Sequence, residues 1–287
     1  MVDFDDVRAQ GRRGEQLLRA GQYAEGFRLY DEAWRTVARG QWLDLPLPRW
    51  RGENLAGARF LISGEQGFGD QIMFARFAKL LQAYGAEVIW PCERPLSRLF
   101  SQCLGFHSEP PGGGPEAAYY CPSGQLPLHF FPPLTEPPSG PYLLTPPARP
   151  ASGAKVGIVT RGDPKHAHDA VRSLPLDLAA ELISSPRTVS LHPEDTGAAD
   201  FHDTAAIIAG LDLVISVDTS VAHLAGAMGK PVWILLSSEW CDWRWMRDRH
   251  DSPWYPSARL FRQPTPGDWT SVVGEVLAGL RTLDVQA

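Results

Sequence analysis

The chain has 287 residues, of which 44% are hydrophobic and 21% charged, and its formal net charge is −6. This composition is that of a globular protein of about two domains, and it excludes disorder over the whole length. The acidic balance gives no general electrostatic reason to bind nucleic acid or an anionic membrane surface. No apolar run approaches the ~20 residues that span a bilayer, so no transmembrane segment is expected.

The cysteines and the first residues indicate the compartment. Cys92, Cys103, Cys121 and Cys241 show no C-x-x-C spacing, and the acidic start MVDFDDVRAQ lacks the pattern of a secretory signal. We therefore expect a cytoplasmic protein with reduced thiols, and we leave peripheral association with the inner membrane open.

Residues 5–39 carry two helix patterns that end on Gly21 and Gly40, with apolar residues at three- and four-residue spacings. We predict a helical hairpin and assign it to residues 1–48. Its G-x-Y-x-x-G-F-x-x-Y pattern resembles one tetratricopeptide repeat (TPR). A single repeat cannot bury its own apolar face, so we expect it to pack on the rest of the chain or on a protein partner.

Residues 49–148 are expected to form a first Rossmann-like domain. A strand in ARFLIS, a glycine loop in GEQGFGD, a helix in QIMFARFAKLLQAYG and a strand in AEVIWP make a βαβ unit. A second short helix is expected in PLSRLFSQCLG. Residues 108–150 hold 13 of the 26 prolines, so we expect there an interdomain linker and only a brief strand or helical turn around residues 119–131.

Residues 149–287 are expected to form a second Rossmann-like domain, because strand and helix patterns alternate along them. Strands are expected in KVGIVT, RTVSL, DLVISV and PVWILL, and helices in PLDLAAELI, TAAIIAG, SVAHLAGAMG and DWTSVVGEVLAGLRTL. Such alternation predicts a mostly parallel, doubly wound sheet. The expected fold class is therefore α/β, with two Rossmann-like domains facing a cleft and a short N-terminal helical hairpin.

In open α/β sheets ligands bind beyond the carboxyl ends of the strands, so residues after each strand are site candidates. The first group follows ARFLIS and contains Gln66, Gly67, Gly69 and Asp70. Glycines let a ligand approach the backbone, and the amides of a helix start favour an anion or a hydroxyl-rich group. Asp70 is expected at or near the helix N-cap, where it either caps the helix or acts as a general base.

The second group is the cationic loop Thr160-Arg161-Gly162-Asp163-Pro164-Lys165-His166, with Arg172 shortly beyond. Three cations suit a diphosphate, because an arginine can bind two oxygens at once. An ordinary solvated loop is the alternative. His166 and His168 beside Asp169 also raise the question of a metal site, but no third ligand has a fixed spacing from the histidines, so none is expected.

The third group is Asp218-Thr219-Ser220, with His223 one turn further on. A helix that begins near Thr219 would direct its first amides and the hydroxyls toward phosphate oxygens. A carboxylate would repel a phosphate, so Asp218 is expected to cap the helix or to bind sugar hydroxyls. His223 is expected to be a hydrogen-bonded core histidine.

Several stretches resemble a known family, bacterial proteins that join tetratricopeptide repeats to a glycosyltransferase domain like that of the lipopolysaccharide heptosyltransferases (glycosyltransferase family 9). They are EQGFGDQIMFARFAKLL, the RS of VRSLPL, VISVDTSVAHLAGAMGKPVWILL, DWRWMRD and SPWYPSARLFRQ, within residues 50–270. The resemblance implies the GT-B architecture, in which the N-terminal domain binds the acceptor and the C-terminal domain binds the nucleotide-sugar donor. It also implies an inverting transfer without a metal or other cofactor. The only D-x-D motif, Asp3-Phe4-Asp5, lies far from either domain.

The resemblance assigns roles to individual residues. Asp70 matches the aspartate of a G-x-G-D motif and would be the catalytic base, and Lys165 would be a phosphate-binding lysine. The Asp-Thr-Ser turn would hold the diphosphate and sugar of the donor. The donor-binding candidates are Thr160, Arg161, Lys165, Arg172, Asp218, Thr219, Ser220 and His223, and the acceptor-side loop contains Gln66, Gly67 and Gly69.

These features predict a hexosyl- or heptosyltransferase-like enzyme that moves a sugar from a nucleotide-diphosphate sugar to a glycan, lipid-linked or protein acceptor. One alternative is a catalytically inactive adaptor that uses its TPR-like hairpin for a protein partner. Another is a nucleotide-sugar epimerase, which would need several acids and histidines near the donor. Asp70, Lys165 and the Asp-Thr-Ser turn together favour the transferase, because an adaptor has no need of all of them.

Overall fold

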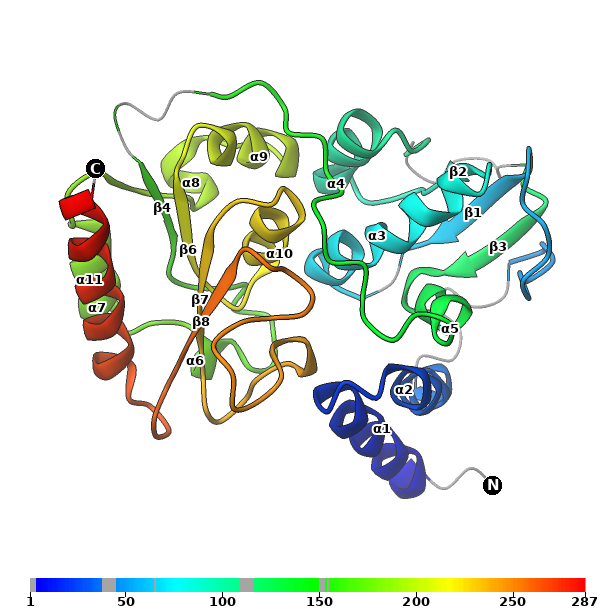
Figure 1. Ribbon diagram of the computed structural model, residues 1–287, viewed down its shortest axis with the longest axis horizontal. Coiled ribbons are helices and arrows are strands. Elements are labelled where there is room, and N and C mark those ends of the chain that lie inside the picture. Colours follow the sequence, from blue (N-terminus) through cyan, green and yellow to red (C-terminus); the bar gives the residue numbers. More distant parts are fainter. Residues whose placement is uncertain are drawn as a thin grey trace. The chain divides into compact units, whose positions relative to one another are not determined.

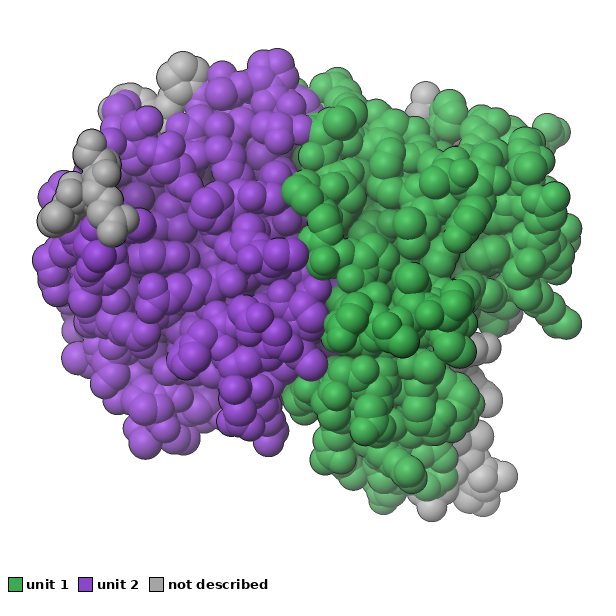
Figure 2. All heavy atoms as spheres, in the orientation of Figure 1, with its two compact units in different colours: residues 1–144 green, residues 145–287 purple. Residues whose placement is uncertain are grey.

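The computed structural model describes residues 4–37, 45–64, 66–108, 116–149, 153 and 155–286. The chain divides into two compact units, Met1–Leu144 and Thr145–Ala287, which we call unit 1 and unit 2 (Figure 2). The division thus falls after residue 144, where the sequence suggested residue 148. Each unit contains its own parallel sheet (Figure 1). That the two face a cleft stays a prediction.

Unit 1 opens with the helices α1 (Phe4–Arg19) and α2 (Tyr23–Val37), which pack on each other as a hairpin. The rings of Tyr23 and Phe27 lie on the ring of Phe131, with centroids 5.1 and 5.7 Å apart. The apolar face of the hairpin is therefore covered by the chain itself. That the hairpin is a tetratricopeptide repeat stays a prediction.

The sheet of unit 1 has three parallel strands in the order β2-β1-β3. They are β1 (Arg59–Ser63), β2 (Glu87–Ile89) and β3 (Tyr119–Pro122). Segments of the chain occupy both outer edges of the sheet: Trp50 donates its amide to the carbonyl of Tyr120, and Trp90 donates its amide to the carbonyl of His107.

The central helix of unit 1 is α3, which is buried from Gln71 to Ala78. The helices are α3 (Phe68–Ala83), α4 (Arg94–Leu99), which a π-helical turn (Phe100–Leu104) continues, the short 3-10 turn η2 (Ser123–Gln125) and α5 (Leu126–Phe130). Both η2 and α5 pack against α3. The helix begins before the predicted Gln71, because Gly67 in an extended conformation serves as its N-cap.

The sheet of unit 2 has five parallel strands in the order β5-β4-β6-β7-β8. They are β4 (Val156–Val159), β5 (Thr188–Ser190), β6 (Leu213–Val217), β7 (Val232–Leu236) and β8 (Ala258–Arg262). Four of the strands lie where the sequence predicts them, and β8 is an additional strand that the pattern analysis missed. In chain order this sheet reads 2-1-3-4-5, one of the common doubly wound arrangements.

Helices cover both faces of this sheet (Figure 1). The longer ones are α7 (Leu176–Ile183), α9 (Phe201–Ala209), α10 (Ser220–Ala227) and α11 (Trp269–Gln286), and the short ones are α6 (Asp169–Arg172), α8 (Pro193–Thr196) and the 3-10 turn η3 (Trp243–Trp245). On one face α7 and α11 share a core with Ile215 and Val217 of β6. None of the described helices is both long and apolar enough to cross a membrane.

Candidate functional site

The loops that follow β4 and β6 meet at one point of the sheet edge in unit 2. Strand β4 pairs with β5 on one side and with β6 on the other, so the chain crosses from β4 to β5 in one direction and then back over β4 to β6 in the other. Sheets of this order bind ligands at that switch point, beyond the carboxyl ends of the strands. Val159, which precedes Thr160, pairs in register with Ser216, two residues before Asp218. The second and third candidate groups of the sequence are therefore neighbours.

Arg172 links these two loops. Its side chain is largely buried, its Nε donates to Asp169 Oδ1 at 3.0 Å, and its Nη1 donates to the backbone carbonyl of Asp218 at 2.9 Å. Gly162 leaves room for the guanidinium, because a Cβ at that position would overlap it. Arg172 thus holds the loops together, and its direct contact with a donor phosphate stays a prediction.

The cations of the loop after β4 differ in what they contact. Arg161 is exposed and forms an ion pair with Glu194. Lys165 is also exposed, its backbone amide donates to Asp163 Oδ1 at 2.9 Å, and within the described residues its ammonium makes no ion pair. Lys165 is therefore a cation that a phosphate can reach without breaking an ion pair of the described structure.

Thr160 ends the strand side of this loop and contacts a histidine that the sequence analysis missed. Its backbone amide donates to His192 Nε2 at 3.3 Å, and its hydroxyl lies 3.2 Å from the same nitrogen. Burial lowers the pKa of His192, and the charge of Arg161 lowers it further. His192 follows β5 by two residues, so the rule that selected the other loops would have found it.

The start of α10 places Thr219 and Ser220 at the same edge. Thr219 is the N-cap residue, with its hydroxyl 3.0 Å from Ser216 Oγ, and Ser220 is the first residue of the helix. The first amides of a helix have no intrahelical acceptor and carry the positive end of its dipole. They suit phosphate oxygens, as the sequence suggests. The cap position belongs to Thr219 and not to Asp218.

Asp218 is 7% exposed, and its environment changes its charge. Burial raises the pKa of Asp218 to about 7, and the negative charge of Asp242 adds to the rise, whereas Trp245, Arg172 and Arg244 oppose it. Near neutral pH the carboxyl group thus holds a proton for much of the time. The repulsion of a phosphate, expected for an ordinary aspartate, is correspondingly weaker.

His223 lies inside unit 2 and not at its surface. It is 6% exposed, its Nδ1 is 2.9 Å from the hydroxyl of Tyr255, and its ring centroid is 5.1 Å from that of Trp245. On the next turn of α10, Gly226 packs so closely on Tyr255 that a Cβ would overlap the ring. The described contacts of His223 are thus those of a core histidine that supports α10.

The two histidines that raised the question of a metal site contact the ring of Trp240, His168 face to face and His166 edge-on. His168 stacks on Trp240 with centroids 4.7 Å apart and 15° between the planes, and the centroid of His166 is 5.5 Å from that of Trp240. Asp169 is engaged by Arg172 and by the hydroxyl of Ser173. This aromatic group joins the loops after β4 and β7 at the carboxyl edge of the sheet.

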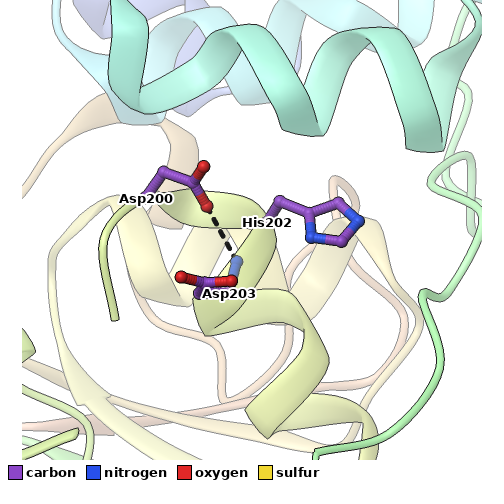
Figure 3. Close-up of side chains that lie close together, drawn as sticks. All are labelled: Asp200, His202 and Asp203. Atoms are coloured by element: carbon purple, nitrogen blue, oxygen red, sulfur yellow. Dashed lines mark hydrogen bonds between the residues drawn. The ribbon is translucent and has the colours of Figure 1, made fainter. Parts of the chain in front are cut away.

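A different group in the described residues has the geometry of possible metal ligands. Ligand atoms of Asp200, His202 and Asp203 lie within 4.8 Å of one another (Figure 3). Asp200 is the N-cap of α9 and accepts the amide of Asp203 at 2.9 Å, which Figure 3 marks with a dashed line. Asp203 Oδ2 in turn accepts the amide of Ala199 at 3.0 Å. Both carboxylates therefore cap the helix, and we assign no metal to this group.

In unit 1, Asp70 is the third residue of α3, and Gly69 is the second. The Oδ2 atom of Asp70 accepts a hydrogen bond from the amide of Gly67 at 2.9 Å, which closes a capping box. The side chain is half-buried and sits beyond the carboxyl end of β1, as a group at the site must. Capping by one oxygen is compatible with a role as a base, because a carboxylate has several lone pairs.

The hairpin reaches the same loop. The hydroxyl of Tyr30 on α2 donates to Gln66 Oε1 at 3.4 Å, and Gln66 has a left-handed backbone with φ of +64°. For a residue other than glycine this conformation costs about 1 kcal/mol or more, and such strain concentrates at functional sites. Gln66 is thus held in an unfavourable conformation next to α3.

Comparison with known families finds one match inside unit 2. Residues 192–236 match the model of glycosyltransferase family 9 (heptosyltransferase). The matched segment begins at His192 and contains α9, β6, α10 and β7, and thus the Asp-Thr-Ser turn.

Comparisons with whole proteins and with solved structures give further similarities. Protein FlbA of Caulobacter vibrioides is 26% identical over an alignment of 329 residues, which covers 95% of this chain and 54% of FlbA, so the chain spans about half of that relative. A family 9 glycosyl transferase from Veillonella parvula has a TM-score of 0.55 at 10% identity, covering 82% of this chain and 99% of that one. Escherichia coli heptosyltransferase WaaC, solved with ADP and with ADP-2-deoxy-2-fluoro heptose, has TM-scores of 0.53 and 0.52 at 12% and 13% identity, covering 78% of this chain and 99% of WaaC.

The solved structures share the α/β fold with parallel sheets, and the family match falls on the segment that carries the Asp-Thr-Ser turn. The resemblance to glycosyltransferase family 9 drawn from the sequence is thereby confirmed.

Proposed function

We propose that this chain, which resembles glycosyltransferase family 9 in sequence and in fold, is an inverting, metal-independent glycosyltransferase. It transfers a sugar from a nucleotide-diphosphate sugar to a glycan, a lipid-linked sugar or a protein. The proposal depends on one observation above all, the contact between Arg172 and the carbonyl of Asp218 that brings the cationic loop and the start of α10 to one switch point. The ADP and ADP-sugar bound to WaaC support a nucleoside diphosphate there.

The donor is bound by unit 2 in this proposal. The ammonium of Lys165 and the first amides of α10 hold the two phosphates, helped by the hydroxyls of Thr219 and Ser220. Asp218 binds a hydroxyl of the donor sugar, since its carboxyl group can donate as well as accept near neutral pH.

The transfer itself is a single displacement. Asp70 takes the proton of the acceptor hydroxyl while the hydroxyl oxygen forms a bond to the anomeric carbon of the donor. The bond from that carbon to the phosphate oxygen breaks, and the nucleoside diphosphate leaves with the electron pair. Because the acceptor oxygen attacks from the opposite side, the configuration at the anomeric carbon is inverted. Lys165 and the amides of α10 stabilise its charge, so the chain supplies the positive charge that a metal supplies in other enzymes.

The adaptor alternative draws no support from the hairpin. Its aromatic face, with Tyr23 and Phe27, is packed on Phe131. The side that carries Arg28 forms ion pairs with Glu25 and Glu32 on the same helix. A partner that needs the apolar face would first have to displace the hairpin from Phe131.

Nucleotide binding tests the donor half of the proposal. We expect one or more nucleoside diphosphates, such as ADP, GDP or UDP, to raise the unfolding temperature in a thermal-shift panel, and EDTA to leave both the shift and donor turnover unchanged. If no nucleotide or nucleotide sugar raises the unfolding temperature, the transferase proposal is wrong.

The base is tested with Asp70→Asn, which keeps an oxygen for the cap. We expect normal folding and nucleotide binding, but turnover of the best donor lowered by ~100-fold or more, as for the loss of a general base. Asp177→Asn is the matched control, because Asp177 is also an acid in the first turn of a helix. Full turnover by Asp70→Asn would exclude Asp70 as the base.

A further inference from the structure

His192 fixes the first residue of the cationic loop in unit 2. The side chain of His192 is buried, and its Nε2 accepts a hydrogen bond from the backbone amide of Thr160 at 3.3 Å. The carbonyl of Thr160 accepts the amide of Leu174 at 2.9 Å, so both backbone groups of Thr160 are bonded. The point at which the chain leaves β4 for the loop is therefore set by His192 on one side and by Leu174 on the other.

The backbone of His192 is itself held at the start of α8. Its amide donates to Ser190 Oγ at 3.2 Å, and this hydroxyl in turn donates to Asp195 Oδ2. Its carbonyl accepts the amide of Asp195 at 3.0 Å and that of Thr196 at 3.1 Å. The imidazole thus projects from a backbone that is bonded at both its amide and its carbonyl.

A second contact joins the same two loops beside the first. Arg161, which follows Thr160, forms an ion pair with Glu194, two residues after His192. About half of each of these charged side chains is exposed, and exposed ion pairs contribute little to stability. The buried contact between Thr160 and His192 is therefore the one that fixes the loop.

That contact requires a neutral imidazole. A ring nitrogen that accepts a hydrogen bond carries no proton, so the proton of His192 is on Nδ1. A proton added to Nε2 would face the amide of Thr160, and both groups would then be donors. The charged ring could donate to the hydroxyl of Thr160, 3.2 Å away, but the buried amide would lose its acceptor.

The surroundings of His192 favour the neutral ring near pH 7. Burial lowers the pKa of His192 below its ordinary 6.5, and the positive charge of Arg161 in the loop after β4 lowers it further. Glu194 and Asp195 of α8 are the acids that act on the ring, and their negative charges oppose this change. The contact is therefore present at neutral pH and is lost as the pH falls through the lowered pKa.

We propose that His192 is a positioning residue of the donor site, whose neutral imidazole holds the cationic loop in its phosphate-binding arrangement and whose protonation releases the loop. It acts through Thr160 on the loop that carries Arg161 and Lys165, and it needs no contact with the donor. The effect on donor binding rests on the proposed transferase function, whereas the contact with Thr160 and its response to protons do not.

Hydrogen exchange of the Thr160 amide in the full chain tests the contact without a ligand. At pH 7.5 this amide should exchange about tenfold faster or more in His192→Phe, which keeps a ring but has no acceptor, than in the unchanged protein. His192→Gln places an amide oxygen near the position of Nε2, so the protection should return. Equal exchange rates in the three proteins would contradict the contact.

Nitrogen-15 NMR of the histidine rings tests the proton state in the unchanged protein, so it does not depend on the folding of a variant at the pH of interest. The signals of His192 are those that disappear in His192→Gln. We expect Nε2 to carry no proton at pH 7.5 and the ring to titrate below the ordinary 6.5. A proton on Nε2 at pH 7.5 would overturn the proposal.

Titration calorimetry with the best-bound of ADP, GDP and UDP tests the effect on the donor site between pH 5 and 8. The affinity of the unchanged protein, divided by that of His192→Gln, should fall about tenfold toward pH 5. In this ratio the protonation of the nucleotide and of Asp218 cancels, because both occur in each protein. A ratio that is constant, or that rises in acid because a charged ring attracts phosphates, would contradict the proposal.

His129→Gln is the matched control, because burial also lowers the pKa of His129, which belongs to unit 1 and not to the donor unit. Its affinity for the nucleotide should follow that of the unchanged protein at every pH. If no nucleoside diphosphate binds, the donor role of His192 is wrong together with the transferase proposal, and amide exchange still decides the contact. If a nucleotide binds and neither exchange nor the affinity ratio depends on His192, this inference alone is wrong.

Discussion

The guanidinium of Arg172 donates to the backbone carbonyl of Asp218 across 46 residues of sequence, with 2.9 Å between Nη1 and the oxygen. The same group is paired with Asp169 in a largely buried ion pair. A change in the loop after β4 is therefore transmitted to the start of α10. The two motifs form one structural element, although they are distant in the chain.

Arg172→Met should destabilise the protein by about 2 kcal/mol, because a buried carboxylate and a carbonyl each lose a charged donor. The free energy of unfolding in urea measures the effect, and nucleotide affinity should fall with it. Arg8→Met is the control, since Arg8 pairs with Asp5 at 3.8 Å on the exposed side of α1. Equal stability of the two variants would contradict the linking role of Arg172.

The raised pKa of Asp218 predicts a dependence of stability on pH. In the unfolded chain its pKa is near the ordinary 3.8, and in the folded protein it is about 7. Between these values the folded state binds the extra proton, so the stabilisation present at low pH is lost as the pH rises to about 7. Asp218→Asn lacks this proton equilibrium. The free energy of unfolding of Asp218→Asn, relative to that of the unchanged protein, should therefore increase by ~1.4 kcal/mol for each pH unit until the pH reaches about 7.

Urea midpoints of the parent and Asp218→Asn at pH 5, 6, 7 and 8 measure this difference. Above pH 7 the two curves should run parallel. A difference that does not vary with pH would mean that Asp218 is ionised throughout, as an exposed aspartate would be.

Lys165→Ala should weaken the binding of a nucleoside diphosphate about tenfold, which corresponds to ~1.4 kcal/mol for one charge-assisted contact. Titration calorimetry at low and high salt measures it, and the affinity of the variant should depend less on salt. Lys155→Ala is the control, because Lys155 precedes β4 at the opposite edge of the sheet and pairs with Asp212. An unchanged affinity of Lys165→Ala would remove Lys165 from the donor site.

Gly226→Ala should lower the free energy of unfolding by about 1–3 kcal/mol, since the new methyl group overlaps Tyr255 in a packed interior. Displacement of Tyr255 would also break its hydrogen bond to His223 and move the start of α10, so nucleotide binding should weaken. Gly274→Ala, also in a helix but with open space around its Cβ, should be neutral or stabilising by up to ~1 kcal/mol. If both variants behave alike, α10 does not depend on this contact.

Site motifs that follow long apolar strands could be predicted from the sequence, because the end of such a strand marks the carboxyl edge of the sheet. Strands β4 and β6 were predicted correctly, and with them the places of Thr160 and Asp218. The short strand β8 was missed, since ARLFR has neither a continuous apolar run nor strict alternation and directly follows an aromatic loop. The start of α3 was predicted too late. The sequence pattern suggested a first residue at Gln71, whereas Gly67 caps the helix and Phe68 is its first residue, so Asp70 lies inside the first turn.

Contacts between distant segments account for most of what remained hidden. Trp240 lies on His168, and the charge of Asp242 raises the pKa of Asp218, but neither pair has a sequence spacing that reveals it. The pKa of Asp218 depends on burial by such segments, so no local pattern predicts it.

The covered edges of the sheet in unit 1 bear on how copies of the chain meet. An open strand edge invites pairing with a second molecule, which leads to aggregation or strand exchange. Here the amide of Trp50 already bonds to Tyr120 on β3, and the carbonyl of His107 already accepts from Trp90 beside β2. These two short segments therefore occupy the backbone groups at both edges of the three-stranded sheet, so a strand of a second molecule cannot pair there without displacing them.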